Sequence, residues 1–326
     1  MMVTLADERS GSAQPFRLHV LSIDRESEGT LLVRLGAVDQ ALLPHWTPGA
    51  HIDLILPNGL MRQYSLCGCR DDRQSWTIVV QKEPVGRGGS AYVHEHLVAG
   101  DELVVAGPRN NFPLVESDAY LFIAGGIGIT PILPMIAEVS RKCRRWTLVY
   151  GGRSLRSMAL LNAIATYEDG EIHLIPFDEL GPIDLAKFLG RPEPGTKVYC
   201  CGPGQLIDAV ESFCASWPPA ALHRERFAPK YLEACADSGA FEVELARSGR
   251  VVCVSPDQSL LGALEDAGYC ITNSCRAGIC GTCLLTVLDG TPEHRDDLLD
   301  DAQREAGKMI LPCVSRSKTL RLVLEL

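Results

Sequence analysis

The sequence lacks any long hydrophobic run. Its most apolar stretch, residues 121–136, is interrupted by three glycines and two prolines, whereas a membrane-spanning helix needs about 20 consecutive apolar residues. The first 15 residues include Asp7, Glu8 and Arg9 and have no apolar core of the kind that a secretory signal requires. We therefore expect no membrane segment and a cytoplasmic, thiol-reducing location.

The sequence also lacks an excess of positive charge. It has 31 Lys and Arg residues against 41 Asp and Glu residues, a formal net charge of −10 and a pI near 5.3. This balance argues against a role in binding nucleic acid. With 46% hydrophobic and 22% charged residues, the composition is that of a folded globular protein, and the length favours two or three domains.

Three regions follow one another along the chain. Residues 16–115 alternate short apolar runs with turn residues, which is typical of an antiparallel barrel or sandwich. Between residues 120 and 201, strand-like and helical stretches alternate, which predicts a parallel sheet with helices on both faces. We expect a first domain at 1–115, a second at 116–228, a linker at 229–238 and a third domain at 239–326.

Four of the 13 cysteines have the spacing of a metal-cluster loop. They are Cys275, Cys280, Cys283 and Cys313, in the pattern C-x4-C-x2-C followed by 29 residues and a last cysteine. This is the plant-type spacing of a [2Fe–2S] cluster. Gly278 and Gly281 let the loop wrap closely and leave N–H groups facing the sulfurs. A zinc site is the alternative, but closed zinc sites usually pair two short ligand units, and here the distal ligand is a lone cysteine.

Two motifs in the first region could bind a flavin. The residues concerned are Arg62, Tyr64 and Ser65 in one expected strand, and Gly88, Gly89 and Ser90 at the start of an expected helix. The strand would supply a cation, an aromatic face and a hydroxyl, and the glycine-rich helix start would offer N–H donors to a phosphate. The alternatives are rim packing for Tyr64 and a solvated charge for Arg62.

A second glycine-rich turn follows the strand expected at residues 120–124. It includes Gly126, Gly128 and Thr130 but lacks the G-x-G-x-x-G spacing of the ordinary dinucleotide fingerprint. Free N–H groups and the positive end of a helix would still face a pyrophosphate there. The alternative is a turn that only packs a helix against the sheet.

Together these motifs resemble the ferredoxin-NADP reductase superfamily. The order flavin, nucleotide, [2Fe–2S] is similar to that of the phthalate dioxygenase reductase and vanillate demethylase reductase family, and the loop CRAGICGTC resembles that of plant-type ferredoxins. The resemblance implies an antiparallel flavin-binding β-barrel, a parallel-sheet nucleotide-binding domain and a C-terminal β-grasp ferredoxin-like domain. Because relatives with the ferredoxin at the front tend to use FAD, the order in this chain favours FMN.

The resemblance also implies roles for individual residues. Arg62 and the loop at 88–90 would hold the FMN phosphate, Tyr64 would stack on the isoalloxazine ring, and Ser65 would bond near flavin N5. Three further matches lie later in the chain: Cys201, with Gly202 and Pro203, would lie beside the nicotinamide, and Phe227 would cover the second flavin face. From the residues alone, Cys201 and Phe227 could equally be core residues.

The charge after the third strand of the second region bears on nucleotide choice. Relatives that prefer NADP have residues able to bind the 2′-phosphate there, whereas this chain has Asp178 and Glu179. Carboxylates would repel a 2′-phosphate and could accept a hydrogen bond from a free 2′-hydroxyl. Arg153 and Arg156 would act in the opposite direction if they reach the site. We therefore expect NADH.

These observations predict an iron–sulfur flavoprotein reductase, in which NADH reduces FMN and the electrons pass singly to the cluster. The eight histidines show no ligand-like cluster and no paired Cys-x-His motif, so oxygen chemistry would belong to another protein. By resemblance that partner is a Rieske-type oxygenase acting on an aromatic compound, by ring hydroxylation or O-demethylation. The alternative is a redox sensor without a turnover partner. An acidic run at residues 293–305, expected to form an exposed loop and helix, could steer the partner.

Overall fold

We describe a computed structural model of the chain, in residues 15–39, 41–84, 86, 88–229 and 239–326. These residues form two compact units, an N-terminal unit up to Gly202 that also includes residues 206–225, and a C-terminal unit of residues 203–205 and 226–326. The linker expected at 229–238 lies, from residue 230 onward, outside the described residues. None of the helices in the described ranges is long and apolar enough to cross a membrane.

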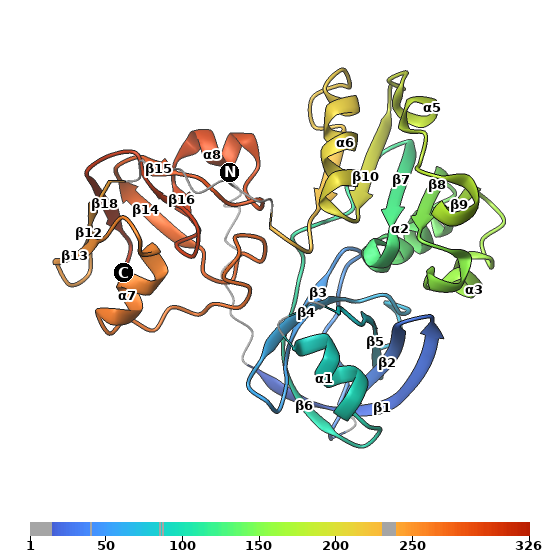
Figure 1. Cartoon of the computed structure of the whole chain (residues 1–326), viewed down its shortest axis with the longest axis horizontal. Helices are drawn as coiled ribbons and strands as arrows, with labels where there is room; N and C mark the ends of the chain where they lie inside the picture. Colours follow the sequence, from blue (N-terminus) through green and yellow to red (C-terminus); the bar gives the residue numbers. More distant parts are fainter. Residues whose placement is uncertain (1–14, 40, 85, 87, 230–238) are drawn as a thin grey trace, which may run out of the picture. The chain divides into compact units, whose positions relative to one another are not determined.

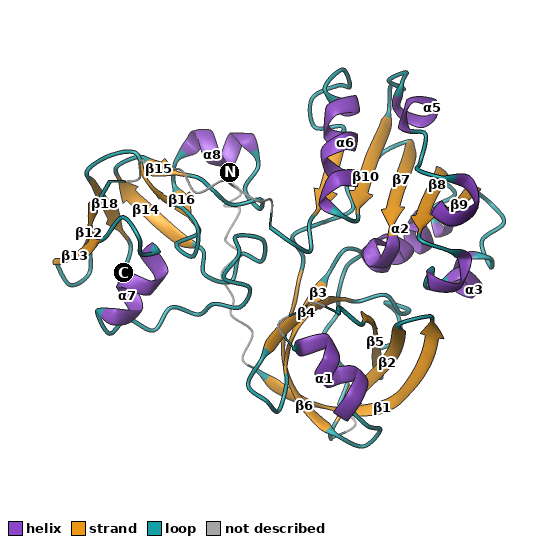
Figure 2. Cartoon of the chain, in the orientation of Figure 1, coloured by secondary structure: helices purple, strands orange, loops and turns teal. Residues whose placement is uncertain are grey.

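The first sheet of the N-terminal unit is a six-stranded antiparallel sheet in the order β4-β3-β6-β1-β2-β5 (Figures 1 and 2). Its elements are β1 (Phe16–Ser27), β2 (Thr30–Ala37), β3 (His51–Ile55), β4 (Met61–Ser65), β5 (Ser75–Gln81), α1 (Gly89–His96) and β6 (Glu102–Arg109). Alternate side chains such as Ile52 and Leu54 on β3 point into a core that also holds Leu18, Val33 and Val105. This alternation produces the curved, barrel-like sheet that the apolar pattern predicts.

The second sheet of this unit is parallel throughout, in the order β11-β10-β7-β8-β9. The elements of this region are β7 (Ala119–Gly125), η1 (Gly126–Gly128), α2 (Ile129–Arg141), β8 (Arg145–Gly152), η2 (Leu155–Ser157), α3 (Leu161–Ile164), β9 (Glu171–Pro176), α4 (Phe177–Leu180), α5 (Leu185–Leu189), β10 (Thr196–Cys201), α6 (Gly204–Cys214) and β11 (Leu222–Glu225). Phe122 and Ile123 belong to different core clusters, as expected of a sheet covered on both faces. The predicted parallel sheet is confirmed.

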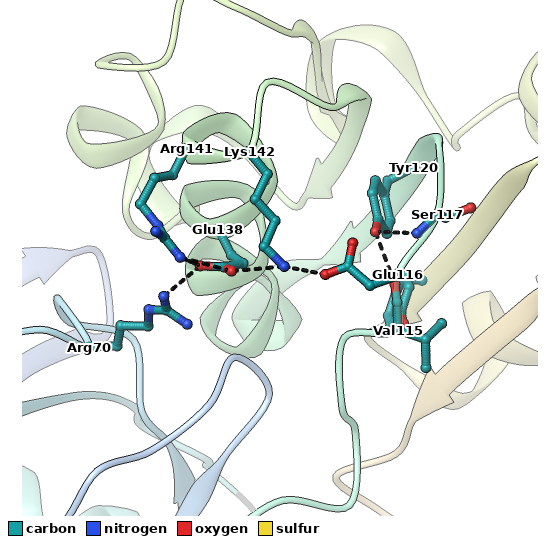
Figure 3. Close-up of polar contacts among 9 residues, drawn as sticks. Arg70, Val115, Glu116, Ser117, Tyr120, Glu138, Arg141 and Lys142 are labelled. Carbon is teal, nitrogen blue, oxygen red and sulfur yellow. Dashed lines mark hydrogen bonds and ion pairs between the residues drawn. The ribbon is translucent and has the colours of Figure 1, made fainter.

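An ion-pair network joins the two sheets of the N-terminal unit (Figure 3). The nearly buried carboxylate of Glu138, on α2, lies 2.9 Å from Nη2 of Arg70 in the loop between β4 and β5. The same carboxylate binds Arg141 at 2.8 Å and Lys142 at 3.2 Å, and Lys142 also pairs with Glu116. The loop that follows β4 is therefore fixed to the helix that follows the glycine-rich turn.

The C-terminal unit contains a five-stranded mixed sheet in the order β13-β12-β18-β14-β16 and a small β15-β17 pair. Its elements are β12 (Phe241–Leu245), β13 (Arg250–Val254), α7 (Leu260–Asp266), β14 (Leu285–Asp289), β15 (Pro292–Glu293), α8 (Asp301–Ala306), β16 (Met309–Ile310), β17 (Arg316–Ser317) and β18 (Arg321–Leu324). Strands β12 and β13 form an antiparallel hairpin, and the last strand runs parallel to β12. Leu260 and Leu264 of α7 pack on the sheet, giving the β-grasp arrangement expected of a ferredoxin-like unit.

Candidate cofactor sites

The structure brings the two predicted flavin motifs together. Arg62 lies on β4 and packs directly against the start of α1, because a Cβ atom on Gly89 would lie only 2.4 Å from Arg62 Nε. Gly88 precedes the helix with a φ of +81°, and no side chain caps the helix. The hydroxyl of Ser90 accepts a hydrogen bond from Glu83 N at 3.0 Å and closes the loop. A guanidinium beside free N–H groups at a helix start suits a phosphate.

The other two residues predicted to contact the flavin, Tyr64 and Ser65, occupy the end of β4. Tyr64 pairs in register with Ile52, and burial raises the pKa of its phenol to about 12. Ser65 is buried and faces His51 across the strand pair. Arg62 and Tyr64 are two residues apart on the edge strand β4 and therefore share a face of the sheet, and Ser65 ends the strand.

A buried polar cluster behind β4 was not predicted from the sequence. Asp53 of β3 is 1% exposed and accepts hydrogen bonds from Gln63 Nε2 at 2.8 Å and from Arg109 Nη2 at 2.6 Å. Nearby, burial and the positive charge of Arg109 lower the pKa of His51 to about 4, so this imidazole is neutral at pH 7. From β3, Asp53 thus links β4 to β6. Its partners are spread over the sequence without a local motif.

The glycine-rich turn after β7 meets the turn after β10. A Cβ atom on Gly128 would lie 2.1 Å from the carbonyl oxygen of Cys201, and one on Gly202 would lie 3.0 Å from Gly125. The Thr130 hydroxyl donates to Ile127 O at 2.9 Å, within the same turn. The two turns predicted to bind the nucleotide therefore adjoin at the carboxyl ends of neighbouring parallel strands, where ligands bind in open α/β sheets. Pro203 follows directly and is exposed.

Glu225 is a candidate functional residue that sequence reasoning missed. It pairs in register with Cys201 at the end of β11. Burial raises the pKa of this carboxyl to about 8 and raises that of the Cys201 thiol well above its usual value. Glu225 Oε2 has no hydrogen-bond partner among the described residues. Strand β11 is short and polar, so the apolar pattern did not indicate it. The one sequence feature that could have pointed to Glu225 is its position two residues before Phe227, a residue that is 42% exposed.

The acidic and the basic residues expected near the nucleotide ribose lie at the same edge of the parallel sheet. Asp178 and Glu179 form the first turn of α4, directly after β9. The backbone N–H of Asp178 donates to Arg153 O at 3.1 Å, so the acidic turn and the segment with Arg153 and Arg156 are adjacent. Asp178, Glu179, Arg153 and Arg156 are exposed.

The four predicted ligand cysteines gather as two pairs. Cys275 lies within hydrogen-bonding distance of Cys280, and Cys283 lies within that distance of Cys313. In the described part of the chain, no three His, Cys, Asp or Glu side chains gather around the position of one metal ion. Two thiolate pairs suit a cluster of two irons better than the tetrahedral set of a zinc ion.

Backbone N–H groups of the loop point at these sulfurs. Ala277 N lies 3.3 Å from Cys275 Sγ, and Thr282 N lies 3.5 Å from Cys280 Sγ. Gly278 and Gly281 have φ values of +71° and +74°, in the left-handed region that glycine tolerates. The loop is therefore pre-shaped for anionic sulfurs, and its residues fit a [2Fe–2S] cluster.

The acidic run at 293–305 differs from its expected form. Asp300 and Asp301 are exposed as predicted, with Asp300 capping α8. Asp296, however, is 3% exposed, and the side chain of His294 is also largely buried. The expectation of an exposed loop was therefore wrong for this part, because the segment folds back beneath the cysteine loop.

Comparison with known proteins identifies the relatives of this chain. Residues 243–318 match the family of 2Fe-2S iron-sulfur cluster binding domains. Phenoxybenzoate dioxygenase subunit beta of Ectopseudomonas oleovorans is 41% identical over 96% of this chain and 98% of its own length. Vanillate O-demethylase oxidoreductase of Pseudomonas putida is 40% identical over 94% of this chain and 98% of its own length.

Solved structures agree with these relatives. The structure of phthalate dioxygenase reductase, described as modular for electron transfer from pyridine nucleotides to [2Fe-2S], is similar with a TM-score of 0.69 and 33% identity, covering 96% of this chain and 98% of that one. An intact type IV self-sufficient cytochrome P450 monooxygenase is similar with a TM-score of 0.91 and 37% identity, over 96% of this chain and 41% of that one. The chain belongs to the phthalate dioxygenase reductase and vanillate demethylase reductase family of oxidoreductases, which use a flavin, NADH and a [2Fe–2S] cluster.

Proposed function

We propose that this protein is the NADH-dependent reductase component of an oxygenase system and delivers electrons to a Rieske-type oxygenase that acts on an aromatic compound. One observation carries the proposal. This chain is similar to reductase subunits over nearly its whole length, and it combines the motifs predicted to bind flavin on β4 and α1, the glycine-rich turn after β7 and the two cysteine pairs. The relatives include both dioxygenase and O-demethylase reductases, so ring hydroxylation and O-demethylation are the two reactions proposed for the partner.

When bound, the three cofactors supply conversion of a two-electron hydride donor into a one-electron donor. In the proposed flavin site, Arg62 and the Gly88, Gly89, Ser90 loop hold the phosphate of FMN. Tyr64 would lie against the ring, and Ser65 would bond near N5. The contact between Arg62 and Gly89 supports this assignment, because it places the cation beside free helix N–H groups.

In the proposed nucleotide site, Gly126, Gly128 and Thr130 shape the turn that receives the pyrophosphate. Cys201, followed by Gly202 and Pro203, would lie beside the nicotinamide, and the partly buried Glu225 lies next to Cys201 in the sheet. Phe227 is exposed rather than packed in a core, which supports the role, implied by the family resemblance, of an aromatic residue that would stack on the flavin. Asp178 selects NADH through its carboxylate.

The three regions at 1–115, 116–228 and 239–326 are proposed to carry one cofactor each, with the oxygenase docking at the last. Cys275, Cys280, Cys283 and Cys313 are the proposed cluster ligands. The exposed acids Asp300 and Asp301 on α8 support docking to a basic partner surface.

A direct experiment uses the purified holoprotein. Chromatography of the released flavin should give FMN, and FAD in stoichiometric amount would refute that part. Rapid mixing with NADH and a Rieske oxygenase encoded nearby in the genome should reduce the oxygenase, while a redox sensor would reduce neither the oxygenase nor a dye rapidly. The neighbouring genes would also narrow the aromatic substrate.

A further inference from the structure

The C-terminal unit buries a carboxylate that none of the cofactor assignments uses. Asp296 is 3% exposed, although it belongs to an acidic run whose other members Asp300 and Asp301 are exposed. Removing an ionised carboxylate from water is strongly unfavourable unless hydrogen bonds replace the lost hydration. A buried Asp296 therefore requires partners, and the structure supplies them.

The partners of Asp296 organise a tight turn. Its Oδ1 accepts hydrogen bonds from Leu298 N at 3.1 Å and Leu299 N at 2.8 Å. Its backbone carbonyl accepts from the Arg304 guanidinium, which also donates to Leu299 O at 2.9 Å. The carboxylate thus fixes the turn that precedes α8, and Arg304 holds that turn from the helix side.

This turn touches the three-cysteine loop. The backbone N–H of Asp297 donates to Gly278 O at 3.0 Å. A Cβ atom on Gly278 would lie 3.1 Å from the Cα atom of Asp296 and 2.6 Å from a methyl group of Val314. The loop that carries Cys275, Cys280 and Cys283 therefore rests on the backbone of Asp296, and only glycine leaves room for this approach.

The same turn also touches the segment that carries the fourth cysteine. Asp296 Oδ2 accepts a hydrogen bond from the hydroxyl of Ser315 at 3.4 Å. Ser315 is fully buried, lies two residues after Cys313, and accepts from Arg295 N at 3.1 Å. His294 Nδ1 also lies near this carboxylate, at 3.7 Å.

We propose that Asp296 is a positioning residue that holds the Cys275–Cys283 loop and the Cys313 segment at the spacing that the [2Fe–2S] cluster requires. Its carboxylate binds Ser315 directly and fixes the turn whose backbone, at Asp297 N, binds Gly278 O, and it is not itself a ligand. The inference rests on the proposed function, in that the four cysteines are taken as the cluster ligands. A second consequence is electrostatic, because a buried negative charge behind the loop opposes the addition of an electron to the cluster.

The test uses full-length holoprotein with flavin and cluster bound, in the variants Asp296→Ala, Asp296→Asn and Ser315→Ala. Asp289→Ala is the matched control, because Asp289 is an exposed aspartate of the same unit. Loss of the cluster to an iron chelator is followed by visible absorbance. The reduced cluster is recorded by EPR, its potential is measured against a reference dye, and thermal unfolding reports the fold.

We expect Asp296→Ala to lose the cluster at least about tenfold faster than wild type, since two N–H groups and Ser315 lose their acceptor. Asp296→Asn keeps an acceptor of the same shape and should restore retention to within about threefold of wild type. It should also shift the cluster toward the reduced form by up to about tenfold at a fixed solution potential, which is about 59 mV for a one-electron couple. Ser315→Ala should lose the cluster faster than wild type, and Asp289→Ala should match wild type.

Wild-type retention and an unchanged EPR spectrum in Asp296→Ala would overturn the inference. If Asp296→Ala gives no folded protein, the other two variants decide: an unchanged potential in Asp296→Asn together with wild-type retention in Ser315→Ala would overturn it, and a shift in either would support it. A wild-type protein without a [2Fe–2S] signal would overturn the proposed function first, and this outcome is distinguishable because it needs no variant.

Discussion

The two units form their cofactor sites in different ways. In the N-terminal unit the sites join residues that are distant in sequence, so that Gly89 packs on Arg62 and Gly128 packs on the backbone of Cys201. In the C-terminal unit one short loop supplies three of the four proposed ligands, and its N–H groups already face the sulfurs. A local loop is visible in the sequence as spacing, whereas a site made by strand register depends on close packing between glycines and backbone.

The largest expected effect is loss of the cluster from the C-terminal unit without a change in the N-terminal unit. Cys280→Ser should abolish the [2Fe–2S] signal. Cys280 and Cys275 form one of the two proposed ligand pairs, and serine does not supply the thiolate that this pair requires. Flavin content and NADH-driven flavin reduction should remain largely intact, because the N-terminal unit is compact in itself. EPR of the reduced protein and rapid-mixing absorbance give both answers. An unchanged EPR signal would show that Cys280 is not a ligand.

Gly128→Ala should have the opposite effect, impairing the N-terminal unit and leaving the C-terminal unit unchanged. The added methyl group would lie 2.1 Å from Cys201 O, so the turn after β7 must move away from β10, a change that typically costs about 1–3 kcal/mol. We expect NADH binding to weaken at least about tenfold, with cluster and flavin retained.

Gly126→Ala is the matched comparison for this variant. Gly126 has no atom within 4 Å of the added carbon but has a φ of +54°, so its cost is the backbone strain of about 1 kcal/mol. Titration of NADH against both variants and wild type measures the difference. Equal affinities in wild type and Gly128→Ala would mean that the turn does not receive the nucleotide.

A third prediction concerns the pH dependence of the N-terminal unit. Burial raises the pKa of Glu225 from 4.5 to about 8, so the folded protein keeps a proton that the unfolded chain releases. This contribution to stability is complete below pH 4.5, declines as pH rises toward 8 and then levels off. The slope from this group should be at most about 1.4 kcal/mol per pH unit.

Thermal unfolding at about pH 6 and about pH 8 tests this sign. Glu225→Gln should remove most of the difference between the two pH values, because the amide stays neutral. Glu193→Gln, at an exposed position of the same unit, should behave as wild type. If wild type and Glu225→Gln lose the same stability across this range, Glu225 ionises normally.

The two sheets of the N-terminal unit could be predicted from the sequence, because the pattern of apolar residues reports which faces are buried. The alternating runs of residues 16–115 and the buried strand at 120–124 indicate a half-buried antiparallel sheet and a doubly covered parallel one, and both are present. Periodicity reports burial on a face, and burial determines these layers. Strand β11 escaped because it is only four residues long, with polar side chains.

The buried charges could not be predicted in the same way. Asp53, Glu138 and Asp296 look like ordinary surface acids in the sequence but are buried in the folded chain, and one carboxylate oxygen of the partly buried Glu225 is inaccessible to solvent. Glu138, for example, meets Arg70 only because two sheets pack together. A pattern of residue types carries no information about such long-range pairs, although they support both cofactor regions.

The choice of nucleotide should have a moderate effect. We expect kcat/KM for NADH to exceed that for NADPH by at least about tenfold, or roughly 1.4 kcal/mol, because Asp178 repels a 2′-phosphate. Asp178→Ala should narrow the ratio, and Arg153→Ala should widen it, since the two segments adjoin at one edge. Steady-state reduction of a dye with both nucleotides decides the point, and equal rates in wild type would place the ribose elsewhere.

The smallest effect is expected at the surface of the C-terminal unit. Asp300 and Asp301 are exposed on α8, and their charge would act mainly on the association rate with a basic partner, in a way that salt weakens. The double variant Asp300→Asn, Asp301→Asn keeps an N-cap side chain for the helix, since asparagine caps as well as aspartate does. We expect it to slow reduction of the true oxygenase by a few-fold at low ionic strength, on the scale of exposed charges, while dye reduction stays unchanged. Asp296 is left intact here, because its substitution would test the cluster rather than the surface. Stopped-flow reduction of the oxygenase at two salt concentrations measures the effect, and equal rates at low salt would mean that these acids only solvate the helix.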